Sequence, residues 1–213
     1  VFFISESVGF VVGECKSYGN GFYASCWGMS DFTPYEGKVI SYNNKNMPNN
    51  KIIVILGKCC AGKDTLARFM ADNLGFNFVV STTSRPMREG ESEGNPYHFI
   101  LDEEFQRKIA NGDFIEYREY KTNGGNWHYG VEKSVVIDNE CYVAVLDIVG
   151  LREFKKQFGD RVFSIYLLVD YDERLRRCVS RGDFNEKEWK RRAISDDEMF
   201  DNVPCSEFDY VKI

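Results

Sequence analysis

One stretch of the chain constrains its fold more than any other: residues 52–67 read IIVILGKCCAGKDTLA. The run Ile52–Leu56 consists of apolar, mostly β-branched residues, which is typical of a strand that is buried on both faces. Gly57, four further residues, Gly62 and Lys63 follow, and a helical pattern of apolar residues begins directly afterwards. In this order glycines let successive backbone N–H groups turn toward phosphate oxygens, and the lysine adds a full positive charge. The stretch therefore predicts a phosphate-binding loop.

A glycine turn that carries a surface lysine is the simpler alternative, but it gives no reason for the buried strand before the loop. We therefore predict that the loop binds the triphosphate of a nucleotide. The predicted contacts come from consecutive residues: Gly57, Lys58, Cys59, Cys60, Ala61, Gly62, Lys63, Asp64 and Thr65.

The length and composition are those of one α/β domain with a small extension. The 213 residues are 43% hydrophobic and 28% charged, which is enough apolar material for a substantial core. The formal net charge of −6 argues against a nonspecific binder of nucleic acid or of anionic membranes, since either normally needs a basic surface. Nor does any run approach the roughly 20 apolar residues of a membrane span. We expect neither a nucleic-acid nor a membrane partner.

The cysteine pattern indicates the redox compartment. There are seven cysteines, an odd count, and their spacings match no zinc-binding pattern. Two of them, Cys59 and Cys60, stand side by side in the predicted phosphate loop. We interpret all seven as reduced thiols, which predicts a cytoplasmic protein.

The first part of the chain differs in amino-acid composition from the rest. Residues 1–46 are rich in Gly, Tyr, Phe and Ser, and short apolar runs flank Gly19-Asn20-Gly21, a pattern that predicts a β-hairpin or a small β-meander. Residues 41–50 are polar and predict a linker. We expect an N-terminal extension over 1–46 and the main domain over 47–213. The extension contains no catalytic constellation.

A second group of residues also suits a phosphate. Arg85 and Arg88 flank Pro86 and follow a run of hydroxyl side chains. The planar arginine fork pairs bidentately with phosphate oxygens. Taken alone, this segment would be a solvated basic turn. Its position about twenty residues after a phosphate loop favours a clamp for a second phosphate.

The segment around these arginines resembles a known family. Residues 81–99 read STTSRPMREGESEGNPYHF, which is similar to the guanylate kinase signature, roughly S-x-T-T-R-x-P-R-x-G-E-x-x-G-x-x-Y-x-F. The resemblance extends over about residues 51–213, and the 81–99 segment is its specific part. It implies an α/β fold, a P-loop kinase core with a parallel sheet flanked by helices. It also implies an inserted, mixed α+β GMP-binding subdomain at about 81–135 and a mobile helical lid at about 170–195.

The resemblance implies ATP-dependent phosphorylation of GMP or dGMP, with Mg²⁺ as the cofactor, by a monomer or a homodimer. The family's GMP-binding positions correspond to Ser81, Arg85, Arg88, Tyr97, Glu116, Tyr129 and Asp147. Its catalytic positions correspond to Lys63, Arg85, Arg181 and Arg191, and its metal positions to Asp64, Thr65 and Asp147. The chemistry of Glu116 agrees with this role, because guanine presents two adjacent donors and a carboxylate has two acceptor oxygens.

Each of these positions also has a simpler interpretation. Asp147, at the end of a predicted strand, would cap the helix that follows. Tyr97 and Tyr129 would be core aromatics with surface hydroxyls. Glu116 would be an exposed strand carboxylate. The two lid arginines lie in a strongly charged stretch that would be a solvated helical face.

The chain departs from the family pattern at three positions. Asp64 stands where the family carries a magnesium-binding serine, and Val131 stands where it carries Ser or Thr. Val149 replaces a second aspartate. These changes weaken recognition of the base and leave the phosphate contacts whole. Three alternatives therefore stay open: another deoxynucleoside monophosphate, ribose 1,5-bisphosphate, or a scaffold-type domain that binds phosphopeptides without catalysis. Glu116 and Tyr97 favour GMP or dGMP.

Overall fold

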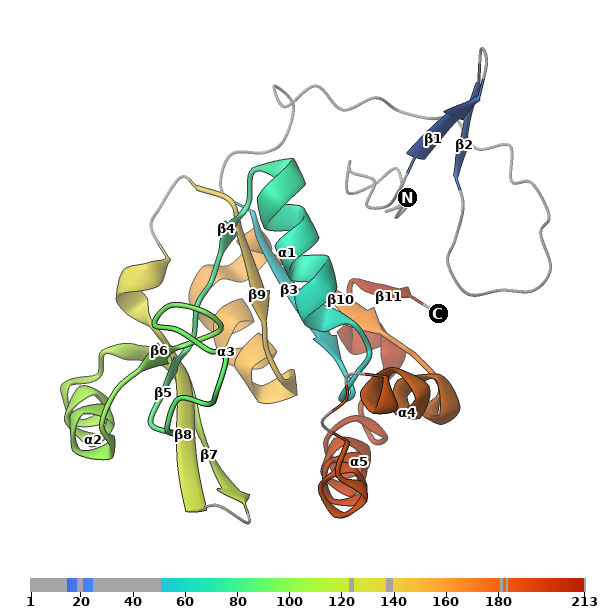
Figure 1. The fold of residues 1–213 in the computed structure, drawn as a ribbon. Coiled ribbons are helices and arrows are strands. Elements are labelled where there is room, and N and C mark those ends of the chain that lie inside the picture. The colour runs from blue at the N-terminus through green and yellow to red at the C-terminus, as the bar shows by residue number, and fades with distance from the viewer. Residues whose placement is uncertain are drawn as a thin grey trace. The chain divides into compact units, whose positions relative to one another are not determined.

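A computed structural model describes residues 15–18, 21–24, 51–122, 125–136, 140–180, 182 and 184–212. The chain divides into two compact units, residues 1–48 and 49–213. In the first unit, strands β1 (Cys15–Tyr18) and β2 (Gly21–Ala24) pair in antiparallel fashion, as the sequence predicts for this segment (Figure 1). Most of the predicted extension lies outside the described residues.

The second unit is built on a parallel sheet of five strands in the order β11-β10-β3-β9-β4. All of its strand pairs are parallel, which confirms the predicted α/β core. The central strand is fully buried, with 0% exposure from Ile52 to Leu56, as its continuous apolar run predicts. The strands are β3 (Ile52–Gly57), β4 (Asn77–Phe78), β9 (Tyr142–Val145), β10 (Val162–Leu167) and β11 (Tyr210–Lys212).

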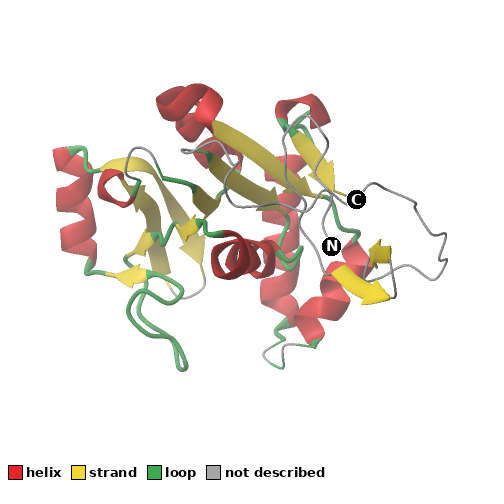
Figure 2. Ribbon diagram, turned by 90° about the horizontal axis from the view of Figure 1, so that it is seen from above, coloured by secondary structure: helices red, strands yellow, loops and turns green. Residues whose placement is uncertain are grey.

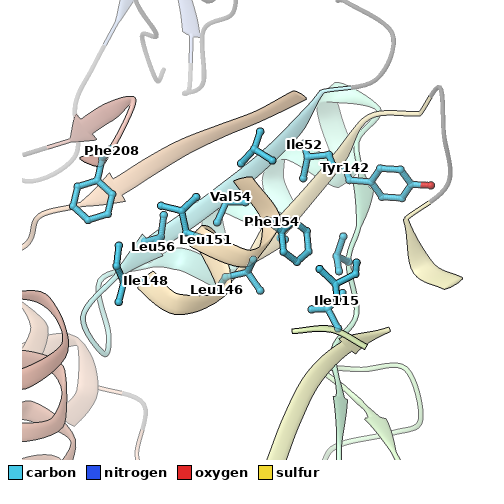
Figure 3. Close-up of a cluster of buried hydrophobic side chains, with 14 of the residues drawn as sticks. Ile52, Val54, Leu56, Ile115, Tyr142, Leu146, Ile148, Leu151, Phe154 and Phe208 are labelled. Atoms are coloured by element: carbon cyan, nitrogen blue, oxygen red, sulfur yellow. The ribbon is translucent and has the colours of Figure 1, made fainter. Parts of the chain in front are cut away.

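Helices cover both faces of this sheet (Figures 1 and 2). Alternate residues of β3 point to opposite faces, and Ile52 and Val54 belong to a core cluster with Leu151 and Phe154 of α3 (Figure 3). Helix α1 packs against the other face. The helices are α1 (Lys63–Leu74), α3 (Ile148–Phe158), α4 (Tyr171–Val179) and α5 (Glu186–Phe200), with short 3₁₀ turns η3 (Gly159–Arg161) and η4 (Cys205–Glu207).

A second, smaller sheet forms the predicted mixed α+β insert. Its strand order is β6-β5-β8-β7, with β5 and β6 parallel and the other pairs antiparallel. The long hairpin β7–β8 dominates it in Figure 1. The elements are β5 (Thr82–Thr83), β6 (His98–Phe99), α2 (Asp102–Asn111), β7 (Phe114–Thr122), β8 (Gly125–Glu132) and the 3₁₀ turn η2 (Lys133–Val135).

The helices that border the site have defined starts. The Asp147 side chain accepts from the Gly150 amide at the N-terminus of α3, and the Asp170 and Asn185 side chains cap α4 and α5 in the same way. Such caps satisfy amides that the helix itself leaves unpaired. Across the described part of the chain, no helix has both the length and the apolar character that crossing a bilayer demands.

Candidate active site

A cavity of about 980 Å³ opens at the carboxyl ends of β3 and β9. Three parts of the second unit line it: the loop after β3, the inserted subdomain and helix α5. In Figure 1 the β7–β8 hairpin and α5 flank the end of β3. Ligand sites of open parallel sheets lie at this edge, outside the carboxyl ends of the strands.

The loop between β3 and α1 has the geometry of a phosphate-binding loop. Gly57 and Gly62 have φ angles of 150° and 97°, and Cys60 lies at 62°. A Cβ atom on Gly57 would lie 2.9 Å from the Leu167 carbonyl oxygen, so only glycine fits there. Because Gly62 directly precedes α1, the first amides of the helix point toward the loop.

Lys63 turns back over this loop. Its Nζ donates to the carbonyl oxygens of Gly57 at 2.8 Å and of Lys58 at 3.1 Å. Burial lowers the pKa of the ammonium group, although the carboxylate of Asp196 opposes the shift. The cation therefore lies at the cavity wall with weak hydration, where a phosphate group would gain most from it.

An acidic face of α5 covers the loop. Asp196 Oδ2 accepts from the Cys59 backbone N–H at 2.5 Å. Lys58 forms ion pairs with Asp197 at 2.6 Å and with Asp201 at 2.5 Å. A carboxylate thus occupies a donor of the type that phosphate uses in such loops. The sequence analysis missed these contacts, because no spacing rule joins a loop to a helix residue 137 positions away.

The first arginine of the predicted clamp, Arg85, is held in place by neighbouring side chains. Arg85 is only 5% exposed, and its fork donates to both carboxylate oxygens of Glu91, at 2.7 and 2.6 Å. Its guanidinium lies 5.3 Å from the ring centroids of Tyr97 and Phe99. The pairing raises the pKa of Arg85 and lowers that of Glu91. The sequence analysis did not identify Glu91 as a site residue, although its position three residues after Arg88 could have indicated that it pairs with the clamp.

Other predicted GMP contacts, the base contact Ser81 among them, line the same cavity. Ser81, Arg88, Tyr97 and Tyr129 all line the cavity with Arg85. The Arg88 amide donates to Glu91 at 2.8 Å, and the rings of Tyr97 and Tyr129 meet edge to face at 5.4 Å. Burial raises the pKa of Tyr97 to about 12, so its hydroxyl stays protonated and able to donate.

The opposite end of the cavity is acidic. Glu116 is 9% exposed, and burial together with Asp147 raises its pKa to about 7. Asp147 caps α3 by accepting from the Gly150 amide at 2.7 Å, and it also accepts from the Tyr120 hydroxyl at 3.0 Å. The simpler interpretation of Asp147 as a helix cap is therefore correct, and the residue lines the cavity as well.

Two further cavity residues come from the strand that carries Glu116. Arg118 and Tyr120 follow it at alternate positions of β7 and line the same wall. Side chains two apart on a strand share a face, so the prediction of Glu116 as a site residue already implied both. The sequence analysis missed them because it considered only positions of the family pattern.

Helix α5 supplies the predicted lid arginine that the structure describes. Arg191 lines the cavity and donates to both carboxylate oxygens of Glu188, at 2.8 Å each. Arg192 pairs with the same carboxylate at 2.8 Å, and the arginines hold the pKa of Glu188 at about 2. The other predicted lid arginine, Arg181, lies outside the described residues.

The predicted metal residues do not come together as a cluster. Asp64 and Thr65 are exposed in the first turn of α1 and lie outside the cavity lining, whereas Asp147 is part of that lining. Among the residues that the structure describes, no group of three His, Cys, Asp or Glu side chains forms a metal cage.

The sequence of the chain is similar to those of known proteins. Residues 49–212 match the sequence model of the guanylate kinase family. A guanylate kinase of Symbiobacterium thermophilum is 37% identical over 139 residues, which are 64% of this chain and 65% of that protein. One of Chlorobaculum tepidum is 31% identical over 172 residues, which are 78% of this chain and 86% of that protein.

A solved structure gives the same result for the fold. The crystal structure of a guanylate kinase from Anaplasma phagocytophilum matches with a TM-score of 0.54 and 28% sequence identity. The match covers 77% of each chain. This likeness confirms the P-loop kinase fold expected from the sequence.

Proposed function

Because this chain belongs to the guanylate kinase family, we propose that it transfers the γ-phosphoryl group of ATP to GMP or dGMP. The family predicted from residues 81–99 is thereby confirmed. One observation carries the proposal: a single cavity is lined by Lys63 of the phosphate loop, by the clamp around Arg85, and by Glu116. Donor and acceptor groups would therefore meet in one space, as direct phosphoryl transfer requires.

The donor ATP binds at the loop over Gly57–Thr65. Loop amides and the N-terminus of α1 cradle its phosphates, and Lys63 lies along the transferring group. Because the ammonium is buried, its attraction to phosphate is stronger than it would be in water. The contact between Asp196 and the Cys59 amide breaks when a phosphate takes its place.

The acceptor phosphate of GMP binds between Arg85, Arg88, Tyr97 and Tyr129. Glu91 fixes the Arg85 guanidinium before the substrate arrives, so little side-chain entropy is lost on binding. Tyr97 and Tyr129 contribute neutral hydroxyl donors. The acceptor is already an ionised phosphate, and no general base is needed.

The guanine ring binds against Glu116, with Ser81 and Asp147 alongside. An ionised Glu116 accepts from the N1–H and the exocyclic amine of guanine. This pairing also explains why a carboxylate is kept in a place where burial raises its pKa to about 7. Two donors from the base offset the cost of that buried charge.

The residues present fit Mg²⁺ on the loop side of the site. Mg²⁺ takes one or two protein oxygens and completes its shell with water and substrate phosphates, so no preformed cage is needed. Asp64 and Thr65 would hold it, beside Lys63. The Asp147 carboxylate already accepts two hydrogen bonds and lies near Arg118, which favours its role on the guanine side. Bound Mg²⁺ supplies positive charge that neutralises the phosphates.

Closure of the lid completes the site. Arg191 and Arg181 approach the transferring group, where they stabilise its charge and help to exclude water that would hydrolyse ATP. Glu188 already orients Arg191 toward the cavity. We further propose a reducing, cytoplasmic location and a monomer or homodimer; the thiols of Cys59, Cys178 and Cys205, which form no disulfide among the described residues, support the compartment.

The test is a coupled assay of ADP release with a panel of acceptors: GMP, dGMP, dTMP, dCMP, AMP and ribose 1,5-bisphosphate. We expect the highest kcat/KM with GMP or dGMP, and the same order in direct detection of GDP or dGDP. Higher efficiency with ribose 1,5-bisphosphate or a pyrimidine nucleotide would contradict the proposal. So would binding of a phosphopeptide together with absence of ADP release for every acceptor.

A further inference from the structure

Arg118 is the feature of the cavity that the proposed function leaves unexplained. Its Nη1 donates to the Tyr117 carbonyl oxygen at 2.5 Å. Its Nε and Nη2 are buried and have no hydrogen-bond partner among the described residues. Buried donors of a charged group are costly when they stay unpaired. Both atoms are closed to solvent in this conformation, although Arg118 lines the ligand cavity, so a ligand can complete their hydrogen bonds once the side chain turns toward it.

No described neighbouring side chain forms a hydrogen bond with these atoms, although Nε lies within ion-pair distance of Asp147. Arg118 Nε lies 3.6 Å from Asp147 Oδ2, which is beyond hydrogen-bond distance. The Asp147 oxygens accept instead from the Gly150 amide and the Tyr120 hydroxyl. The positive charge of Arg118 opposes the rise in the pKa of Glu116, so the two side chains are close enough to interact. The cation therefore stands beside the carboxylate to which we assign the base.

Apart from the Ser81 hydroxyl, which we place beside the base, and the Tyr120 hydroxyl, which already donates to Asp147, the described residues offer few donors in this part of the cavity. Glu116 and Asp147 are acceptors when ionised, and Val131, which pairs with Glu116 in the β7–β8 register, is buried and apolar. A guanine ring presents N1–H and N2–H donors, but next to them it also presents the O6 acceptor and, further along, N7. If only carboxylates surrounded the base, the partial negative charge of O6 would face other negative charges. The free N–H groups of Arg118 have the complementary sign.

We propose that Arg118 is a specificity-determining residue that donates from Nε and Nη2 to the O6 and N7 edge of the purine. This inference rests on the proposed function, because it takes the Glu116 side of the cavity as the base site. The ligand class is a 6-oxopurine nucleoside monophosphate. A 6-aminopurine is rejected because its amino group would point a donor at the guanidinium.

The test separates Arg118 from the rest of the site by removing single groups from the substrate. Dissociation constants for wild type and Arg118→Ala are measured by calorimetry with GMP, with IMP, and with 2-aminopurine riboside monophosphate. IMP keeps O6 and N1–H and lacks the 2-amino group, whereas the 2-aminopurine nucleotide lacks both O6 and N1–H and keeps N7, so the comparison of wild type with Arg118→Ala for each ligand isolates the contribution of Arg118. We expect Arg118→Ala to weaken the binding of GMP and of IMP by about tenfold to a hundredfold, as for the loss of a bidentate arginine–guanine pair. Binding of the 2-aminopurine nucleotide, which keeps N7 but offers Arg118 no O6, should weaken clearly less than binding of GMP and IMP.

Two further variants act as controls. Arg107→Ala removes an exposed arginine of α2 that pairs, among the described residues, with Glu104 at 3.4 Å, and it should leave all three constants unchanged. Arg118→Lys keeps the charge without the fork, so it should restore only part of the discrimination. Equal weakening of all three nucleotides by Arg118→Ala would overturn the inference, since a structural or general electrostatic role predicts that result.

Measuring binding keeps this inference distinct from the proposed function. If wild type discriminates O6 through Arg118 but releases no ADP with GMP, the catalytic proposal fails and the recognition by Arg118 holds. If wild type phosphorylates GMP and Arg118→Ala binds it as tightly, the recognition by Arg118 fails and the catalytic proposal holds. If wild type binds none of the three nucleotides, both proposals are wrong.

Discussion

Lys63 connects the fully buried strand β3 to the proposed chemistry. It ends the loop that follows β3, and its ammonium group is held by two carbonyl oxygens of that same loop. Burial disfavours the charge, as the lowered pKa indicates. A cation kept in such a place is expected to act on a charged substrate, because little in the protein itself is gained from burying it.

Replacement of Lys63 by alanine should therefore affect chemistry more than GMP binding. We expect kcat to fall by about a hundredfold to a thousandfold, the range seen when one transition-state donor is lost. The KM for GMP should change by about twofold or less, because GMP binds elsewhere in the cavity. Steady-state kinetics measures both, and Lys121→Ala, an exposed lysine of β7, is the matched control. A Lys63→Ala enzyme with normal kcat would refute the assigned role.

The raised pKa of Glu116 makes GMP use dependent on pH. Binding needs the ionised carboxylate, and the free enzyme reaches that form only as the pH rises through about 7. We therefore expect kcat/KM for GMP to fall with decreasing pH below about 7 and to reach a plateau above it. The phosphate of GMP ionises near pH 6 and adds a second, lower step.

The Glu116→Gln enzyme distinguishes the two steps. Its amide does not titrate, so the step near pH 7 should disappear while the lower one remains. Its kcat/KM for GMP should also be lower at every pH, because an amide offers one acceptor where the carboxylate offers two. An unchanged profile would show that another group produces the titration.

At the scale of elements, a carboxylate of α5 occupies a backbone donor of the phosphate loop that a bound phosphate would also use. Asp196 accepts the Cys59 amide that a phosphate would use, and it adds negative charge near Lys63. Asp197 and Asp201 strengthen the contact through Lys58. Helix α5 therefore holds the loop through an internal anion, and with the proposed function we expect ATP to displace it.

The Asp196→Ala enzyme should bind ATP more tightly than wild type. One net hydrogen bond is worth about 1 kcal/mol, so we expect the dissociation constant to fall about fivefold. The constant for GMP should not change. Glu198 is exposed on the same helix, and Glu198→Ala provides the control for loss of charge alone. Calorimetric titration with ATP and with GMP measures both effects, and weaker ATP binding by Asp196→Ala would contradict the displacement.

The contrast between the loop and α5 shows which parts of the site the sequence predicted. The phosphate loop and the 81–99 segment carry their information in local spacing, and both lie at the cavity as expected. The parallel sheet was implied by the family resemblance, and the apolar run of residues 52–56 predicted the burial of its central strand. The contacts of Asp196 with Cys59 depend on how distant elements pack, which no local pattern encodes. Arg118 was missed for a simpler reason, since alternation from Glu116 along the strand would have predicted it.

At the scale of the whole molecule, the proposed activity requires only the second compact unit. That unit spans residues 49–213, has its own core and contains every described residue of the cavity. The family match covers nearly the same range, residues 49–212. The hairpin of β1 and β2 belongs to the other unit.

A truncated chain that begins at residue 49 should therefore fold and keep its activity. Compact units with their own core fold independently, so we expect kcat/KM for GMP and for ATP to stay within about twofold of the full chain. Circular dichroism and the coupled assay test this directly. Loss of activity in a truncated chain that is still folded would show that residues 1–48 contribute to catalysis.

At Gly57 the fully buried strand β3 ends and the phosphate loop begins, and this change has a consequence for hydrogen exchange. The amides of Ile52 to Leu56 lie in a fully buried central strand, so they exchange only when the whole unit unfolds. A few residues later, the loop amides exchange through local opening, which ATP would suppress. A single proteolytic fragment that spans residues 52–67 would thus contain the slowest and some of the most ligand-sensitive amides. Mass spectrometry of that fragment would report global stability and nucleotide occupancy together.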